Sequence, residues 1–167
     1  MSKAIFRVIT HSDADDVKLF ERLNYIRNPI ATRNTVIYAN YVSSLHPYSE
    51  MKFVKECHKS PLNITTNGKW FLEYVVSLPG EESQNIFNFN DCAKEILTYL
   101  ANYNGNYQAI GCVHVNTDNL HLHIIVNNID FMTGSRFQLT KQNLYMIREE
   151  ISKILNKYGF SGIKEGL

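Results

Sequence analysis

The chain has 167 residues, of which 44% are apolar and 20% charged, a composition typical of a soluble globular domain. It has no apolar run close to the roughly 20 residues that span a bilayer, and its first residues lack the pattern of a secretory signal. Its net charge of +1 counts mildly against a protein that binds nucleic acid mainly by neutralising phosphates, so any such role requires a localised site. We expect one cytoplasmic domain over residues 1–167, with three reduced cysteines and no membrane partner.

Apolar periodicity and turn residues predict nine elements along the chain. In chain order they are a strand (4–10), a helix from a Ser12-Asp13 cap to a stop before Pro29, an extended stretch (35–43), a short helix (49–58), a strand (69–78), a helix from an Asn88 or Asn90 cap to Tyr103, two strands (107–115 and 120–129) and a helix (141–157). This order predicts an α+β fold with a largely antiparallel central sheet flanked by helices.

Three of the six histidines fall within ten residues, in the segment HVNTDNLHLH that begins at His114. His121 and His123 are two residues apart, so on a strand both side chains leave the same face. If residues 116–119 form a hairpin loop, His114 pairs with His121, and paired residues share a face with Cβ atoms about 5 Å apart. The pattern therefore predicts that three imidazoles converge at one point of the sheet.

Three neutral imidazoles form a good site for a divalent cation and leave further coordination positions open for a substrate. Mn²⁺ or Mg²⁺ is the expected ion, and Zn²⁺ or Ni²⁺ also suits such ligands. Asp118 and its neighbouring asparagines are candidate acceptors that hold the imidazoles in orientation.

The spacing His-x-x-x-Asp-x-x-His-x-His-x-x-x-Asn from His114 to Asn127 resembles the third motif of the MOB-P class relaxases, in the HUH endonuclease superfamily. Two shorter segments resemble the first and second motifs of that family: NYIRNP, which contains Tyr25, and YVVSLPGE, which contains Ser77. The resemblance extends from about Phe6 to Gly159. Two positions depart from the pattern: Asn116 stands where many relatives have aspartate, and Ile30-Ala31-Thr32 follows Pro29 where they usually have Lys-Thr.

The resemblance implies the fold expected above and an enzyme that nicks one DNA strand at an origin of transfer, joining its 5′ phosphate to a tyrosine and so initiating conjugative transfer. The implied substrate is single-stranded or hairpin origin DNA, and the implied partners are accessory DNA-binding and coupling proteins of the transfer machinery. Such a domain is often the N-terminal part of a longer protein, and the length of this chain also fits an excised domain. The implied site residues are His114, His121 and His123 as metal ligands, Tyr25 and Asp118 as catalytic residues, and Arg27, Thr32, Arg33, Ser77 and Asn127 as DNA contacts.

Ten tyrosines compete for the role of nucleophile. Tyr25 lies just before the helix stop at Asn28-Pro29, where a side chain can leave the core, and it matches the family motif. Tyr38 and Tyr41 are the rival candidates. His11 follows the first strand and could lie near the site, but we interpret it as a solvated loop residue.

Two other functions remain open at this point. A replication initiator of the same superfamily generally carries its tyrosine after the histidine motif; here Tyr25 precedes it, and only Tyr145 and Tyr158 follow Val126. The other alternative is a non-catalytic, metal-stabilised DNA-binding module. Covalent capture of an oligonucleotide would distinguish a nicking enzyme from that module.

Overall fold

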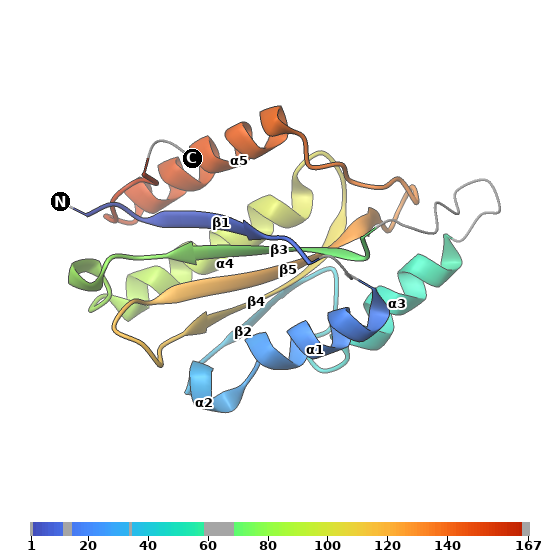
Figure 1. The fold of residues 1–167 in the computed structure, drawn as a ribbon, viewed down its shortest axis with the longest axis horizontal. Helices are drawn as coiled ribbons and strands as arrows, with labels where there is room; N and C mark the ends of the chain where they lie inside the picture. Colours follow the sequence, from blue (N-terminus) through green and yellow to red (C-terminus); the bar gives the residue numbers. More distant parts are fainter. Residues whose placement is uncertain (1, 12–14, 34, 59–68, 165–167) are drawn as a thin grey trace.

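A computed structural model describes residues 2–11, 15–33, 35–58 and 69–164 (Figure 1). In chain order its elements are β1 (Ile5–Ile9), α1 (Asp16–Ile26), α2 (Pro29–Thr32), β2 (Ile37–Asn40), α3 (Pro47–Cys57), β3 (Phe71–Ser77), the 3₁₀ turn η1 (Gly80–Glu82), α4 (Ile86–Asn102), β4 (Tyr107–His114), β5 (His121–Asp130) and α5 (Lys141–Lys157). None of the helices in these ranges is long and apolar enough to cross a membrane.

The five strands form one sheet in the order β1-β3-β5-β4-β2, and every pair of neighbours is antiparallel. The long strands β4 and β5 lie at its centre and are buried along nearly their whole length. The predicted α+β fold with an antiparallel central sheet is therefore confirmed.

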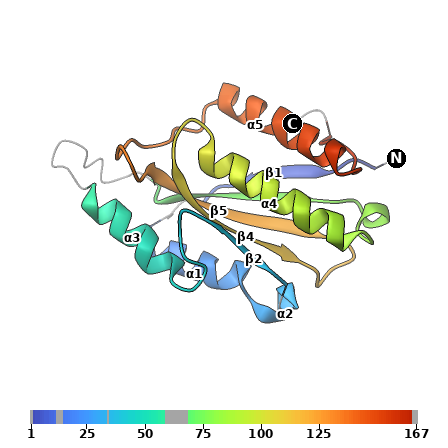
Figure 2. The same ribbon diagram turned by 180° about the vertical axis from the view of Figure 1, so that it is seen from behind.

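Helices cover both faces of the sheet (Figures 1 and 2). On one face, α4 and α5 pack against side chains such as Leu122, Ile124 and Val126 in the larger core cluster. On the other face, α1 and α3 place Leu23 and Met51 in a smaller cluster with Ile125 of β5. Because successive residues of a strand face opposite sides, Leu122, Ile124 and Val126 of β5 belong to the first core, and the histidines of this strand lie on the face of α1.

Three predicted helix starts differ from the structure, and two of them concern the cap. The predicted cap Ser12-Asp13 lies outside the described residues, and the observed cap is Asp15, whose Oδ1 accepts a hydrogen bond from the Lys18 amide at 2.9 Å. The cap of α4 is Asn85 rather than Asn88 or Asn90, because the Asn85 side chain accepts a hydrogen bond from the Asn88 amide and the first turn starts at Ile86.

Proline begins helices here as well as ending them. The helix α1 stops at Ile26, as predicted from Pro29, but Pro29 is itself the first residue of α2, capped by Asn28. Pro47 likewise starts α3 two residues before the predicted position. Proline suits the first helical position, where its missing N–H has no partner to lose and its φ is already helical.

Candidate active site

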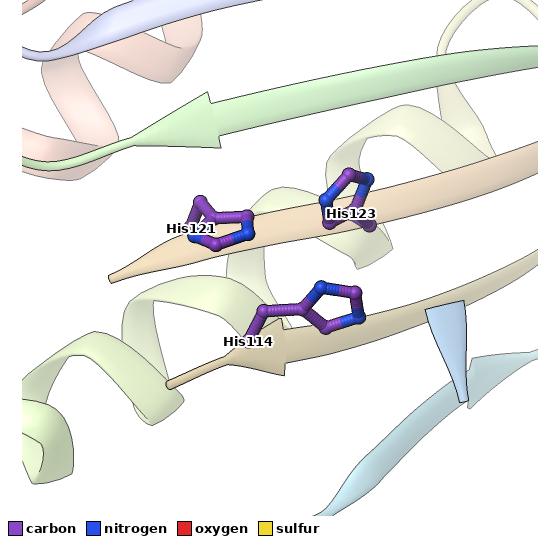
Figure 3. Close-up of side chains that lie close together, drawn as sticks. All are labelled: His114, His121 and His123. Carbon is purple, nitrogen blue, oxygen red and sulfur yellow. The ribbon is translucent and has the colours of Figure 1, made fainter. Parts of the chain in front are cut away.

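The three histidines project from the β4–β5 hairpin into one point on the face covered by α1 (Figure 3). His114 pairs with His121 across the hairpin, as predicted, and His123 pairs with Cys112 one step further along. One ring nitrogen from each histidine lies within 4.8 Å of the others. Nitrogen ligands of one cation at ~2.1 Å lie about 3–4 Å apart, so small side-chain rotations bring these three nitrogens to binding distance.

Each imidazole of the triad (His114, His121 and His123) has one nitrogen occupied by an acceptor, which leaves the other free for a metal. His114 Nε2 donates to the Ile26 carbonyl at 2.8 Å, and His121 Nδ1 donates to the Asn119 carbonyl at 2.9 Å. His123 Nδ1 lies 3.3 Å from Glu73 Oε1. Such partners fix the ring orientation and the tautomer, an arrangement typical of metal-binding histidines.

Burial favours the neutral, metal-binding form of two of these side chains. His114 is 1% exposed, and its burial lowers the pKa to about 4, although the hydrogen bond to the Ile26 carbonyl opposes that change. Burial also lowers the pKa of His121. Neutral imidazoles bind a cation without first releasing a proton, so the chemistry of the donor set fits a divalent metal.

Glu73, which the sequence analysis did not single out, is the carboxylate next to the triad. It lies on β3 on the same face as the histidines and is fully buried. Its oxygens are hydrogen-bonded to His123, to His11 Nε2 at 2.8 Å, and to Arg22 Nε and Nη2 at 2.9 and 2.6 Å. Burial alone would raise the pKa of Glu73, but the hydrogen bonds from His123, Arg22 and His11 outweigh burial and lower it to about 2.

The position of His11 therefore corrects its interpretation as a solvated loop residue. Its side chain is 14% exposed and is held between Glu73 and the ring of Phe71. The sequence did contain an indication that a polar cluster forms here: Glu73 is the one charged residue in the apolar strand FLEYVVS, and it lies on the same strand face as Ser77. A charge at a buried strand position needs partners, and these are His11, Arg22 and His123.

Tyr25 lies in the last turn of α1, beside the triad. Its ring centroid is 5.5 Å from that of His114 and 5.6 Å from that of His123, and the side chain is 47% exposed. The bond from His114 to the carbonyl of Ile26, the next residue, ties the end of α1 to the sheet at this point. The tyrosine ring thus lies next to the three imidazoles, and about half of the residue is exposed.

The rival tyrosines lie elsewhere. Tyr38 is on β2 and packs against the larger core, where burial raises its pKa to about 12. The Tyr41 hydroxyl donates to Asn102 at 2.6 Å, and its ring packs against Phe131. Of these three tyrosines, Tyr25 is the one in contact with the triad.

The remaining candidate residues divide by their surroundings. Ser77 is half-buried and pairs with His121, and Arg33 and Asp118 are exposed in the loops after α2 and between β4 and β5. The other three use their polar groups in hydrogen bonds within the protein. Arg27 donates to the carbonyls of Leu23 and Ser44, and Thr32 donates to the Asn28 carbonyl. The side-chain amide of Asn127 donates to the Met51 carbonyl and to Gln108. Ser77 and Arg33 are therefore the better placed to reach a DNA strand.

The fold is that of relaxase domains. The MobM relaxase domain (MOBV; Mob_Pre) in a Mn-bound structure with plasmid pMV158 oriT DNA superimposes with a TM-score of 0.64, at 17% identity over 99% of this chain and 91% of that one. The same domain bound to 26 nucleotides of that DNA gives 0.66 at 14% identity, covering 99% and 92%. A structure described as "Molecular Basis of Vancomycin Resistance Transfer in Staphylococcus aureus" gives 0.64 at 15% identity, covering 99% and 100%.

Residues 25–160 match the family described as relaxase, MobA/VirD2-like, nuclease domain. The chain therefore belongs to this family, and the resemblance inferred from the histidine motif is confirmed. Two relatives named Protein rlx, both from Staphylococcus aureus, are 29% identical over 62 residues and 36% identical over 56 residues. These segments are 37% and 34% of this chain and 20% and 17% of the relatives, so the match spans about a fifth of each relative's length.

Proposed function

We propose that this domain nicks one strand of origin-of-transfer DNA by transesterification onto Tyr25, beside a divalent cation held by His114, His121 and His123. The observation that carries the proposal is the contact of the Tyr25 ring with two of these three ligands. A nucleophile has to lie next to the group that receives the phosphate, and among the three candidate tyrosines Tyr25 meets this condition.

In the proposed reaction, the Tyr25 hydroxyl gives its proton to the Asp118 carboxylate, and its oxygen attacks the scissile phosphorus. A bond forms between the tyrosine oxygen and phosphorus, the bond from phosphorus to the 3′ oxygen breaks, and that oxygen takes up a proton. The number of phosphoester bonds is unchanged, so the freed 3′-OH can reverse the step without an external energy source. A bound divalent cation would offset the negative charge that develops on the phosphate.

The other residues of the site orient these groups. Glu73 fixes the His123 ring through the Nδ1 hydrogen bond, and the Ile26 carbonyl fixes His114. Ser77 and Arg33 are proposed DNA contacts, and Asp118 is a proposed acceptor for the phenol proton in the hairpin loop. The proposed metal, Mn²⁺ or Mg²⁺, agrees with the Mn-bound state of the MobM domain, and the proposed DNA agrees with the oriT DNA bound there.

The arrangement gives no comparable support to a replication initiator. Tyr145 lies on α5 and Tyr158 caps the same helix, which packs on the sheet face opposite the triad. The Tyr158 hydroxyl also donates to Glu95. Neither side chain is therefore near the metal ligands.

The proposal is tested by incubating the domain with labelled origin-of-transfer oligonucleotides and Mn²⁺, then separating products under denaturing conditions. We expect a covalent protein–DNA band that disappears with chelator, with His123→Ala and with Tyr25→Phe. Tyr41→Phe is the matched control, because it removes the same hydroxyl from a tyrosine bonded to Asn102, and it should leave the band intact. Multiple turnover to free 5′ phosphate without an adduct would contradict the tyrosine mechanism and indicate metal-dependent hydrolysis.

A further inference from the structure

Arg22 connects the buried carboxylate of the site to the ring of Tyr25. Its Nε and Nη2 atoms donate to the two oxygens of Glu73, and its guanidinium carbon lies 4.1 Å from the centroid of the Tyr25 ring. The two residues are three apart on α1 and therefore neighbours on the helix surface. The guanidinium thus makes two hydrogen bonds to Glu73 on β3 and a cation–π contact with the ring of Tyr25.

The Tyr25 ring has contacts with charged and metal-binding groups, but its hydroxyl is not held. The ring lies beside the imidazoles of His114 and His123 in addition to its contact with Arg22. Within the described ranges, the hydroxyl makes no hydrogen bond to another residue. The direction of this half-exposed side chain is therefore set by what touches its ring.

We propose that Arg22, fixed by Glu73, is a positioning residue that holds the Tyr25 ring over the triad in the orientation required for attack. The proposal rests on the function proposed for Tyr25. A half-exposed tyrosine without these contacts would populate several rotamers, and an in-line attack requires one of them. A cation over the ring face favours one placement of the ring, and the bidentate hydrogen bonds to Glu73 fix the position of the guanidinium.

The same bonds make Arg22 a poor candidate for a simple phosphate contact. Two of its donors are already committed to Glu73 at 2.9 and 2.6 Å, and its side chain is 20% exposed. A DNA-binding role would lower affinity when Arg22 is replaced, whereas a positioning role would lower the rate of the chemical step at saturating DNA. Kinetics therefore distinguish the two roles.

The test compares Arg22→Lys, Arg22→Gln and Lys18→Gln in the metal-loaded protein. Arg22→Lys keeps the charge and protects the fold, but loses the planar fork and the flat contact with the ring. Lys18→Gln removes a cation from the same helix, where it pairs with Glu21 at the surface. We expect the maximal rate of adduct formation to fall about 10- to 100-fold in both Arg22 variants, with the half-saturating oligonucleotide concentration changed less than about 3-fold and the control unchanged.

A second readout does not depend on activity. In metal-free protein, the aromatic NMR resonances of Tyr25, assigned with Tyr25→Phe, should move in both Arg22 variants and stay in place in Lys18→Gln. A raised half-saturating concentration with an unchanged maximal rate would overturn the proposal in favour of DNA binding. If the unmodified protein forms no adduct, the function proposed for Tyr25 fails, and unmoved Tyr25 resonances in Arg22→Gln would separately overturn the positioning role.

Discussion

Replacing Glu73 with glutamine keeps the size of the side chain but removes the charge of a fully buried carboxylate. Glutamine keeps one acceptor oxygen but places an NH2 donor where the second stood, so the contacts with Arg22, His11 and His123 can no longer all be made. Removing one partner of a buried ion pair costs about 3–5 kcal/mol, and the partial exposure of Arg22 favours the lower end. We therefore expect the free energy of unfolding of the metal-free domain to fall by about 3 kcal/mol.

The same substitution should weaken metal binding, because the amide no longer fixes the His123 ring as the carboxylate does. Loss of such an outer partner typically lowers metal affinity about 10- to 100-fold. Urea unfolding gives the stability change, and calorimetric titration with Mn²⁺ or Zn²⁺ gives the affinity. Asp118→Asn is the comparison, since this exposed carboxylate should change stability by less than about 0.5 kcal/mol and metal affinity by less than about 3-fold. Equal losses of metal affinity in the two variants would refute the assignment of Glu73 as the carboxylate that orients the ligand.

Three further outcomes are expected. His121→Ala should abolish tight Mn²⁺ binding with little loss of stability. His114→Ala should also destabilise the domain by about 1–3 kcal/mol, because it leaves the Ile26 carbonyl without its partner. Calorimetry measures the metal binding and urea unfolding the stability, and equal stability losses in the two variants would contradict the reasoning. Burial lowers the pKa of His114 from 6.5 to about 4, so the unfolded chain takes up a proton before the folded one as pH falls. The free energy of unfolding of the metal-free domain should therefore drop by about 3 kcal/mol from pH 7 to pH 4. An equally steep loss of stability in a His114→Asn variant over that range would argue against this prediction. The domain should bind nonspecific duplex weakly and with a shallow salt dependence, because its net charge is +1; tight duplex binding in a fluorescence assay at physiological salt would contradict this expectation.

The hairpin with its three histidines was predictable from the sequence because local rules determine it. The alternation of strand side chains and the short loop at 116–119 were enough to pair His114 with His121, and the structure confirms this register. The apolar face of α5 and the antiparallel sheet also follow from periodicity. Helix starts were predicted less well: Asn85, Asn88 and Asn90 lie close together at the start of α4, and nothing local shows that Asn85 rather than Asn88 makes the cap.

The partners of the histidines could not be predicted in this way. Glu73 is 50 residues from His123 in sequence, and Arg22 is 51 residues from Glu73. Their meeting depends on the pairing of β3 with β5 and on the docking of α1 across that face, and neither follows from local patterns. The charge of Glu73 within an apolar strand indicates that a partner exists but does not say which residue it is.

The central claim is that Tyr25 becomes joined to the cleaved strand, and mapping the covalent bond tests it most directly. After reaction with a cognate origin-of-transfer oligonucleotide and Mn²⁺, the protein is digested and the nucleotide-bearing peptide is sequenced by mass spectrometry. We predict a 5′-phosphotyrosine on the peptide that contains Tyr25. A nucleotide on Tyr38, on Tyr41 or on a residue other than tyrosine would contradict the assignment of the nucleophile.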